Sequence, residues 1–307
     1  MKVNPINVTP DMRVSELLDQ FDKSGVLGAG RVSRACNILA DMISDEEMNV
    51  FLSLGGPLIP GGMRNIVSQM IREGHVNLIV SSGANITHDL VEAFGGGHYQ
   101  HEGKDDEELN AEGIGRIGDI NVGADDFTIF ESEITKIFEK IANEKEQISI
   151  QELLHEIGLL VDDENSFVGC AARNNVPIFA PGLIDSMMGL QLWIFSQDHD
   201  FTVDAVADMH YLSDIVFESE KVGAILLGGG LTKHYTLASN VIKGGLDAAI
   251  QITMDRPEAG SLGGAPLEEA KSWAKARCGS SLASVVGDVT IVFPLIYAAA
   301  LDWIGGD

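Results

Sequence analysis

The sequence has few cysteines and no long apolar run. Its three cysteines, Cys36, Cys170 and Cys278, are widely spaced and form no C-x-x-C pair. This spacing argues against a disulfide framework or a zinc site and predicts three buried structural thiols. No run of about 18 uncharged apolar residues occurs, and residues 1–13 lack the apolar core of a signal peptide. We therefore expect a cytoplasmic protein without a membrane segment.

Basic residues are also scarce, because 20 Lys and Arg stand against 46 Asp and Glu, for a formal net charge of -26. Such a charge argues against nucleic acid or an anionic membrane as a partner and would attract cationic ligands. Solubility or adaptation to a salty host explains the same charge equally well. The charge therefore supports a cationic substrate without establishing one.

The chain of 307 residues is long enough to bury a sizeable core. From residue 49 onward, short apolar runs ending in glycine, proline or polar residues alternate with amphipathic stretches. These predicted strands are residues 49–54, 76–83, 176–181, 222–230, 248–254 and 284–291. The rhythm predicts an α/β fold: a Rossmann-like, doubly wound, mostly parallel sheet with helices on both faces. Ligands are expected beyond the carboxyl ends of its strands, where the glycine-rich turns fall.

The first 47 residues differ from the rest. Apolar spacing predicts an extended arm and then two helices, one in residues 14–25 and one in residues 28–43. We expect residues 1–47 to form an N-terminal helical extension and residues 48–307 an NAD-binding domain, with one compact domain overall. A third helix at 127–147 has the phenylalanine spacing of core or subunit packing.

The stretch from Gly260 to Lys275, GSLGGAPLEEAKSWAK, carries the clearest chemical pattern. Its glycines let the backbone approach a ligand, and a helix is predicted to start near Pro266. Glu269 and Trp273, four apart, would share one face of that helix. A carboxylate, an indole and the amine of Lys275 could then line a polyamine pocket with a nucleophilic lysine. Alternating charge on a solvated helix gives the same spacing, so the pattern alone leaves both interpretations open.

Five motifs in order make the chain similar to the deoxyhypusine synthase family, in its archaeal and bacterial branch. The run Glu269, Ser272, Trp273, Ala274, Lys275 resembles the segment whose lysine forms the covalent intermediate. GGGLTKH at 228–234 resembles the run whose histidine faces the same pocket. The other three are VSSGANITHD at 80–89, GIGRIGDI at 113–120 and GDVTIVFPL at 287–295.

The resemblance implies an NAD-dependent transferase. It would move the 4-aminobutyl group of spermidine, through an imine on Lys275, to one lysine of the translation initiation factor 5A precursor. His234 would carry protons, and Glu269 and Trp273 would hold the polyamine. The matching nucleotide contacts are Ser82, Gly83, Asp185, Gly228, Gly230, Gly260, Ser261 and Asp288. A homotetramer is implied as well, with an N-terminal segment that covers a neighbouring site.

Each implied nucleotide contact has a simpler interpretation as well. The glycines could form strand-end turns, and Asp185 or Asp288 could cap helices. His98 and His101 are three apart with no evident third ligand, so we expect no metal site. Arg116 is expected to anchor its loop by a salt bridge.

Four positions depart from the family pattern. Leu190, Leu262 and Ala259 stand where many relatives carry acids, and Ala274 stands where they have glycine. Two alternatives therefore stay open. One is a homospermidine synthase, which passes the same group to putrescine, or another polyamine-using relative. The other is a catalytically impaired, NAD-binding regulatory subunit.

Overall fold

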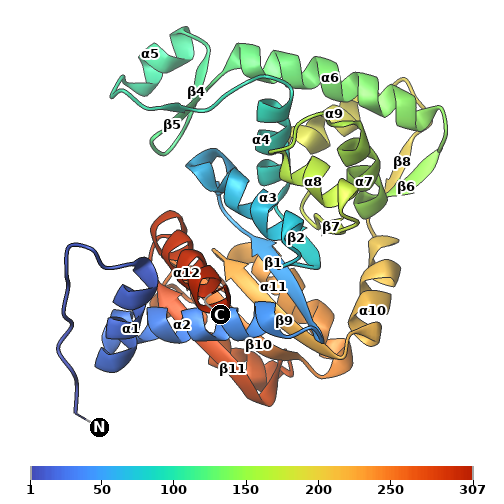
Figure 1. Cartoon of the computed structure of the whole chain (residues 1–307). Helices are drawn as coiled ribbons and strands as arrows, with labels where there is room; N and C mark the ends of the chain where they lie inside the picture. The colour runs from blue at the N-terminus through green and yellow to red at the C-terminus, as the bar shows by residue number, and fades with distance from the viewer. Residues whose placement is uncertain (1, 306–307) are drawn as a thin grey trace. The chain divides into compact units, whose positions relative to one another are not determined.

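A computed structural model describes residues 2–305 (Figure 1). The α-helices are α1 (Val14–Ser24), α2 (Leu27–Ser44), α3 (Arg64–Arg72), α4 (Gly83–Ala93), α5 (Asp106–Ala111), α6 (Ala124–Ala142), α7 (Ile150–Leu160), α8 (Phe167–Arg173), α9 (Met187–Phe195), α10 (Asp208–Glu218), α11 (Gly230–Ser239) and α12 (Val289–Ile304). The strands are β1 (Met48–Leu54), β2 (Leu78–Ser81), β3 (Tyr99–Gln100), β4 (Ile114–Ile117), β5 (Ile120–Gly123), β6 (Gln147–Ser149), β7 (Ile178–Phe179), β8 (Thr202–Asp204), β9 (Lys221–Leu227), β10 (Leu246–Thr253) and β11 (Ala276–Val286). Short helices of other types are η1 (Ile59–Met63), η2 (Asn240–Lys243), η3 (Pro257–Ala259) and η4 (Leu267–Trp273).

The chain divides into two compact units. The first comprises the residues up to Gly55, His75–Val80 and the residues from Tyr211 onward, and the second comprises Gly56–Gly74 and Ser81–His210. The predicted boundary between residues 47 and 48 stays a prediction.

The first unit is built on a sheet of strand order β11-β10-β9-β1-β2. The pairs β1–β9, β9–β10 and β10–β11 are all parallel. The inner strands β9 and β10 are almost continuously apolar and buried, as expected where both faces of a parallel sheet are covered. Helices α2 and α12 lie on one face of the strands and α11 on the other (Figure 1). The predicted α/β class, mostly parallel and covered on both faces, is confirmed.

The N-terminal helices α1 and α2 also form where the apolar spacing predicted them. Helix α1 ends at Gly25, which takes a positive φ of 67°. Ser33 on α2 donates to the Asp22 carboxylate, and the Cys36 thiol donates to the carbonyl of Ile296 on α12. Burial, aided by the charge of Asp19, raises the pKa of the Cys36 thiol to about 12, so this cysteine behaves as a structural thiol.

Two expectations about strand β11 are wrong. The predicted strand at 284–291 ends at Val286, because the Asp288 side chain accepts a hydrogen bond from the backbone N–H of Thr290 and begins α12. Cys278, predicted to be buried, is exposed. The reason is a bulge: Leu246 of β10 pairs with Ala276 but Ala248 pairs with Ser281, so residues 277–280 fall out of register.

The second unit is mostly helical and carries two small sheets. One is antiparallel, with order β3-β5-β4, and the other pairs β6 with β8 in parallel. Helix α6 confirms the predicted packing helix, since Phe130, Ile134 and Phe138 are fully buried. Arg116 forms the predicted salt bridge, with Nε 2.6 Å from the Asp106 carboxylate.

A buried ion pair fixes the centre of the second unit. Arg64 Nε lies 2.7 Å from the fully buried carboxylate of Asp89, which also accepts hydrogen bonds from Ser166 and from the backbone N–H groups of Phe167 and Val168. Arg64 also pairs with Asp163. These partners compensate for removing both charges from water.

Among residues 2–305, no helix is long and apolar enough to cross a membrane.

Candidate active site

A cavity of about 310 Å³ lies between α11 and residues 262–275, within the first unit. It is lined by Lys233, His234, Leu237, Leu262, Ala265, Pro266, Glu269, Ala270, Trp273 and Lys275. The two predicted catalytic residues, Lys275 and His234, therefore share one cavity with the two predicted polyamine contacts, Glu269 and Trp273. Apolar side chains form most of the remaining wall, which suits the methylene chain of an aliphatic amine.

The sequence predicted a single helix that includes Lys275. The structure does not have one there. The 3₁₀-helix η4 ends at Trp273, and Ala274 takes the left-handed conformation with φ 54°. Lys275 follows it as the last residue before β11. Its backbone N–H donates to the Ala270 carbonyl at 2.9 Å, and its carbonyl accepts from Leu246 at 3.1 Å. A left-handed residue ends a helix, so the lysine is presented from a turn that is fixed on both sides.

Gly245 packs closely against the backbone of this turn. It has φ +96°, and a Cβ added there would lie 2.6 Å from the backbone nitrogen of Ala276 and 2.7 Å from the carbonyl carbon of Lys275. Only glycine allows this approach. The role of Gly245 was not predicted from the sequence, because it depends on a contact with a segment that is distant in the chain.

The functional groups of the cavity lie close together. Lys275 is half-buried, and its Nζ lies 5.7 Å from the centroid of the Trp273 ring, within the range of a cation–π contact. Trp273 itself is 66 % exposed, so its indole is open to a ligand. His234 and Glu269 are exposed. The arrangement provides an amine, an indole face, an imidazole and one carboxylate around a single apolar space.

A second lysine, Lys233, lines the cavity and was not predicted from the sequence. Lys233 is buried, and its Nζ donates to the carbonyls of Leu262 at 2.9 Å and Ala265 at 2.6 Å. Burial lowers the pKa of Lys233 to about 8; Glu269 and Asp255 oppose this shift, and the charge of Lys275 adds to it. A signal existed, because Lys233 is three and four residues before the buried Thr236 and Leu237 and so shares their helix face.

The predicted cofactor residues of the first unit follow the carboxyl ends of its strands. Gly228 and Gly230, after β9, both take positive φ, and a Cβ at Gly229 between them would lie 2.4 Å from Cα of Gly263. Gly260, also at positive φ, ends η3, and the hydroxyl of the next residue, Ser261, accepts from the N–H of Gly264. Asp288 caps α12, which confirms its simpler interpretation as a helix cap.

The other predicted cofactor residues, Ser82, Gly83 and Asp185, belong to the second unit. Ser82 caps α4 by accepting from the N–H of Asn85. A Cβ at Gly83 would lie 2.5 Å from the Ser186 hydroxyl, so the start of α4 is close to the residue after Asp185. Ser186, not Asp185, caps α9. The Asp185 side chain is exposed, and within residues 2–305 no hydrogen bond to its carboxylate is seen.

The departures from the family pattern differ in their surroundings. Leu262 lines the cavity of the first unit, where it adds an apolar surface. Ala259 is the last residue of η3, and Leu190 lies 42 % exposed on α9 in the second unit. The lining therefore contains a single carboxylate, that of Glu269, among the described residues.

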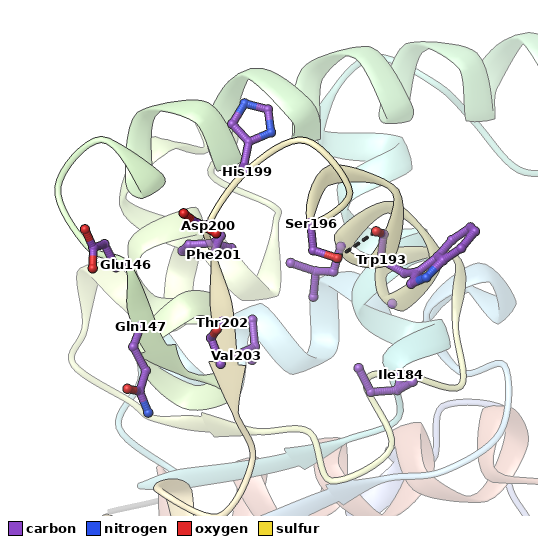
Figure 2. Close-up of a pocket in the computed structure, with 12 residues that line it drawn as sticks. Glu146, Gln147, Ile184, Trp193, Ser196, His199, Asp200, Phe201, Thr202 and Val203 are labelled. Carbon is purple, nitrogen blue, oxygen red and sulfur yellow. Dashed lines mark hydrogen bonds between the residues drawn. The ribbon is translucent and has the colours of Figure 1, made fainter.

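A larger cavity in the second unit, of about 730 Å³, lacks this chemistry (Figure 2). It is bounded by Leu192 and Trp193 of α9, by Ser196 just after that helix, and by Thr202 and Val203 of β8. None of its lining residues, all of them described, is a lysine. Its histidine, His199, stacks on Phe195 with ring centroids 3.9 Å apart.

The two histidines considered above, His98 and His101, contact different residues. His98 contacts His88 and Glu92, whereas His101 contacts Asn121. In the described part of the chain, no group of three or more His, Cys, Asp or Glu side chains could hold a metal ion.

The fold is that of a Rossmann-like α/β protein, and one of its cavities brings Lys275 together with His234, Glu269 and Trp273. Comparison with known proteins gives the family. The sequence model of one family, described as deoxyhypusine synthase, matches residues 16–300. The chain belongs to the deoxyhypusine synthase family, and membership implies a transferase.

Similar proteins extend over nearly the whole chain. A "Probable deoxyhypusine synthase" of Methanothermobacter thermautotrophicus is 59% identical over 98% of each chain. One of the same name from Methanopyrus kandleri is 43% identical over 99% of each. A solved structure from Entamoeba histolytica, described as a "putative deoxyhypusine synthase", has a TM-score of 0.68 at 19% identity and covers 97% of this chain and 96% of that one. At that identity the structural likeness shows the fold alone.

Proposed function

We propose that the protein is a deoxyhypusine synthase that transfers the 4-aminobutyl group of spermidine to one lysine of the translation initiation factor 5A precursor. The observation that carries the proposal is the shared cavity of Lys275, His234, Glu269 and Trp273. Family membership and relatives of 59% and 43% identity support it.

In this proposal each side chain has one task. Glu269 holds an ammonium group of the polyamine and the indole of Trp273 packs over another part of the cation. The amine of Lys275 attacks the oxidised carbon of the substrate, displaces the diamine portion and holds the aminobutyl group as an imine. His234, exposed at the cavity, exchanges protons with the reacting amines.

NAD is the proposed cofactor, and it would accept a hydride from spermidine and return it at the end of the cycle. Ser82, Gly83, Asp185, Gly228, Gly230, Gly260, Ser261 and Asp288 would hold it. Three observations agree with that task. Glycines with positive φ follow β9, a helix N-terminus opens at Gly83, and the exposed Asp185 carboxylate is available to ribose hydroxyls.

A homotetramer in the cytoplasm, with residues 1–47 covering a neighbouring site, completes the proposal by analogy with the family. The second candidate is a homospermidine synthase, in which putrescine takes the place of the factor's lysine. The third candidate is an impaired, NAD-binding regulatory subunit. It is favoured by the presence of a single carboxylate, that of Glu269, in the cavity lining.

The test is covalent trapping. The protein is incubated with NAD and spermidine, treated with borohydride and digested, and the peptides are analysed by mass spectrometry. We expect a butylamine adduct on Lys275 that is absent from Lys275→Ala and retained in the matched control Lys271→Ala, whose side chain is exposed and outside the cavity lining. An adduct-free wild-type protein would support the regulatory subunit instead.

A further inference from the structure

Lys233 is buried in a way that fits a neutral amine better than a permanent cation. Only 2% of the residue is exposed. Within residues 2–305 it makes no ion pair, and its hydrogen-bond partners are two neutral carbonyls, those of Leu262 and Ala265. A neutral amine has two N–H groups, so these two acceptors satisfy it completely and leave its lone pair free. A buried ammonium would normally have a carboxylate partner.

The position of Lys233 connects it to Lys275. Both lysines line the same cavity, whose wall near them is formed by Leu237, Leu262 and Ala265. In such apolar surroundings two ammonium ions repel each other strongly. Burial, reinforced by Lys275, lowers the pKa of Lys233 to about 8, so roughly a tenth of its side chain is neutral at pH 7, far more than for an ordinary lysine.

The charged groups around Lys233 come from several segments. Asp255 follows β10 and Glu269 lies on η4, and both favour the protonated form. Lys275 disfavours it, and His234 lines the same cavity from α11. Since both carboxylates are exposed, water screens their effect, and a proton can be both accepted and released at Lys233.

We propose that Lys233 is the proton acceptor that frees the amine of Lys275 for attack. The proton passes from the ammonium of Lys275 to the amine of Lys233, which becomes an ammonium, and Lys275 is left as a neutral amine with a free electron pair. That pair then forms the bond to the electrophilic carbon. The inference rests on the proposed function for its substrate, but the proton transfer concerns only side chains of this chain.

Lys233 is better placed for this step than His234. The imidazole of His234 is exposed to water, where protons exchange without its help. Lys233 is buried in the wall of the cavity that Lys275 also lines, so its amine is shielded from bulk water.

The test measures the reactivity of Lys275 without NAD or spermidine. The full-length protein is treated with butanal and cyanoborohydride between pH 6 and 10, and butylation of Lys275 is quantified by peptide mass spectrometry against the exposed Lys271. Two variants, Lys233→Arg and Lys233→Gln, keep hydrogen-bond donors for the carbonyls of Leu262 and Ala265 but cannot accept a proton in this range. Thermal unfolding checks that each variant is folded.

We expect labelling of Lys275 in the wild type to rise with an inflection near pH 8. Both variants should lose this inflection and react roughly 100-fold more slowly at neutral pH, as is typical when an acid–base group is removed. A folded variant that reacts like the wild type would overturn the proposal, because Lys233 would then serve only as an anchor. So would a wild-type profile without an inflection, even if neither variant folds. Absence of the spermidine adduct, in contrast, would contradict only the proposed function.

Discussion

At the scale of single residues, the cavity is lined by one carboxylate and two lysines. Glu269 is the only acid in a lining that includes Lys233 and Lys275. A cationic substrate can enter such a site only if its charge is matched and at least one lysine is neutral. Glu269 supplies the matching charge, and the lowered pKa of Lys233 makes that lysine easier to neutralise than an ordinary one.

Removing the charge of Glu269 should weaken polyamine binding. A charge-assisted hydrogen bond contributes about 1.5–3 kcal/mol, and because Glu269 is exposed we expect Glu269→Gln to raise the Kd of spermidine about 10-fold, the lower end. Isothermal titration measures it. Glu268→Gln is the matched control, since this neighbouring acid is exposed and outside the lining. Equal effects of the two substitutions would show that only the general negative field attracts the ligand.

His88 should make stability depend on pH. Burial, followed by the charge of His98, lowers the pKa of His88 from 6.5 to about 4, while Glu92 opposes the shift. His98 Nε2 lies 2.8 Å from His88 Nδ1, and His98 Nδ1 lies 2.7 Å from the Glu92 carboxylate, which also pairs with Arg64. As pH falls, the unfolded chain takes up the proton before the folded one does. The contribution is therefore complete above pH 6.5 and is lost between 6.5 and about 4.

The variant His88→Gln should flatten this dependence. Denaturant unfolding at several pH values should show that the stability lost on acidification is smaller than in the wild type, by at most about 3 kcal/mol. His155→Gln, which removes a half-buried histidine of α7, is the control and should keep the wild-type slope. A parallel curve for His88→Gln would mean that the pKa of His88 is the same in the folded and unfolded states.

At the scale of elements, the turn between η4 and β11 determines where Lys275 points. The sequence predicted one helix through Lys275 because nothing in EEAKSWAK interrupts helical spacing. The left-handed Ala274, at φ 54°, ends the helix at Trp273, two residues before Lys275. This conformation is held by Gly245 and Leu246, which lie about thirty residues away in the chain, so local patterns could not reveal it.

Gly245→Ala should displace this turn. The added methyl group would lie 2.6–2.8 Å from backbone atoms of residues 274–276, at a φ of +96°. We expect a loss of roughly 2–4 kcal/mol in unfolding free energy and loss of the borohydride-trapped adduct on Lys275. Gly244→Ala is the matched control: its φ is +88°, but nothing lies within 4 Å of an added Cβ. It should cost only about 1 kcal/mol and keep the adduct. Equal losses in both variants would show that backbone strain, and not the clash with the lysine turn, is responsible.

At the scale of the whole molecule, the order of elements was largely predictable and their long-range contacts were not. The apolar runs of β1, β9 and β10 were found because buried parallel strands are continuously apolar. The bulge that exposes Cys278 and the hydrogen bonds that bury Lys233 depend on pairing between β10 and β11 and between α11 and residues 262–265. The bulge leaves no periodic signal in the chain, and for Lys233 only the shared helix face with Thr236 and Leu237 indicates burial.

The net charge of -26 has a consequence for the whole chain. Repulsion between so many carboxylates opposes the compact state, and salt screens it. Raising KCl from about 20 mM to about 500 mM should therefore raise the Tm by at least about 3 °C. A calorimetric scan measures the shift, with sucrose at equal osmolality as the uncharged control. An unchanged or lower Tm in salt would mean that the charges are already compensated by the fold.

The most direct test of the central claim follows the aminobutyl group from Lys275 to its acceptor. The protein is loaded with isotopically labelled spermidine and NAD, and either the factor precursor or putrescine is added before borohydride trapping. The account predicts that label leaves Lys275 and reappears on one lysine of the precursor, and that putrescine alone does not clear it. Clearance by putrescine with an unlabelled precursor would contradict it and identify a homospermidine synthase.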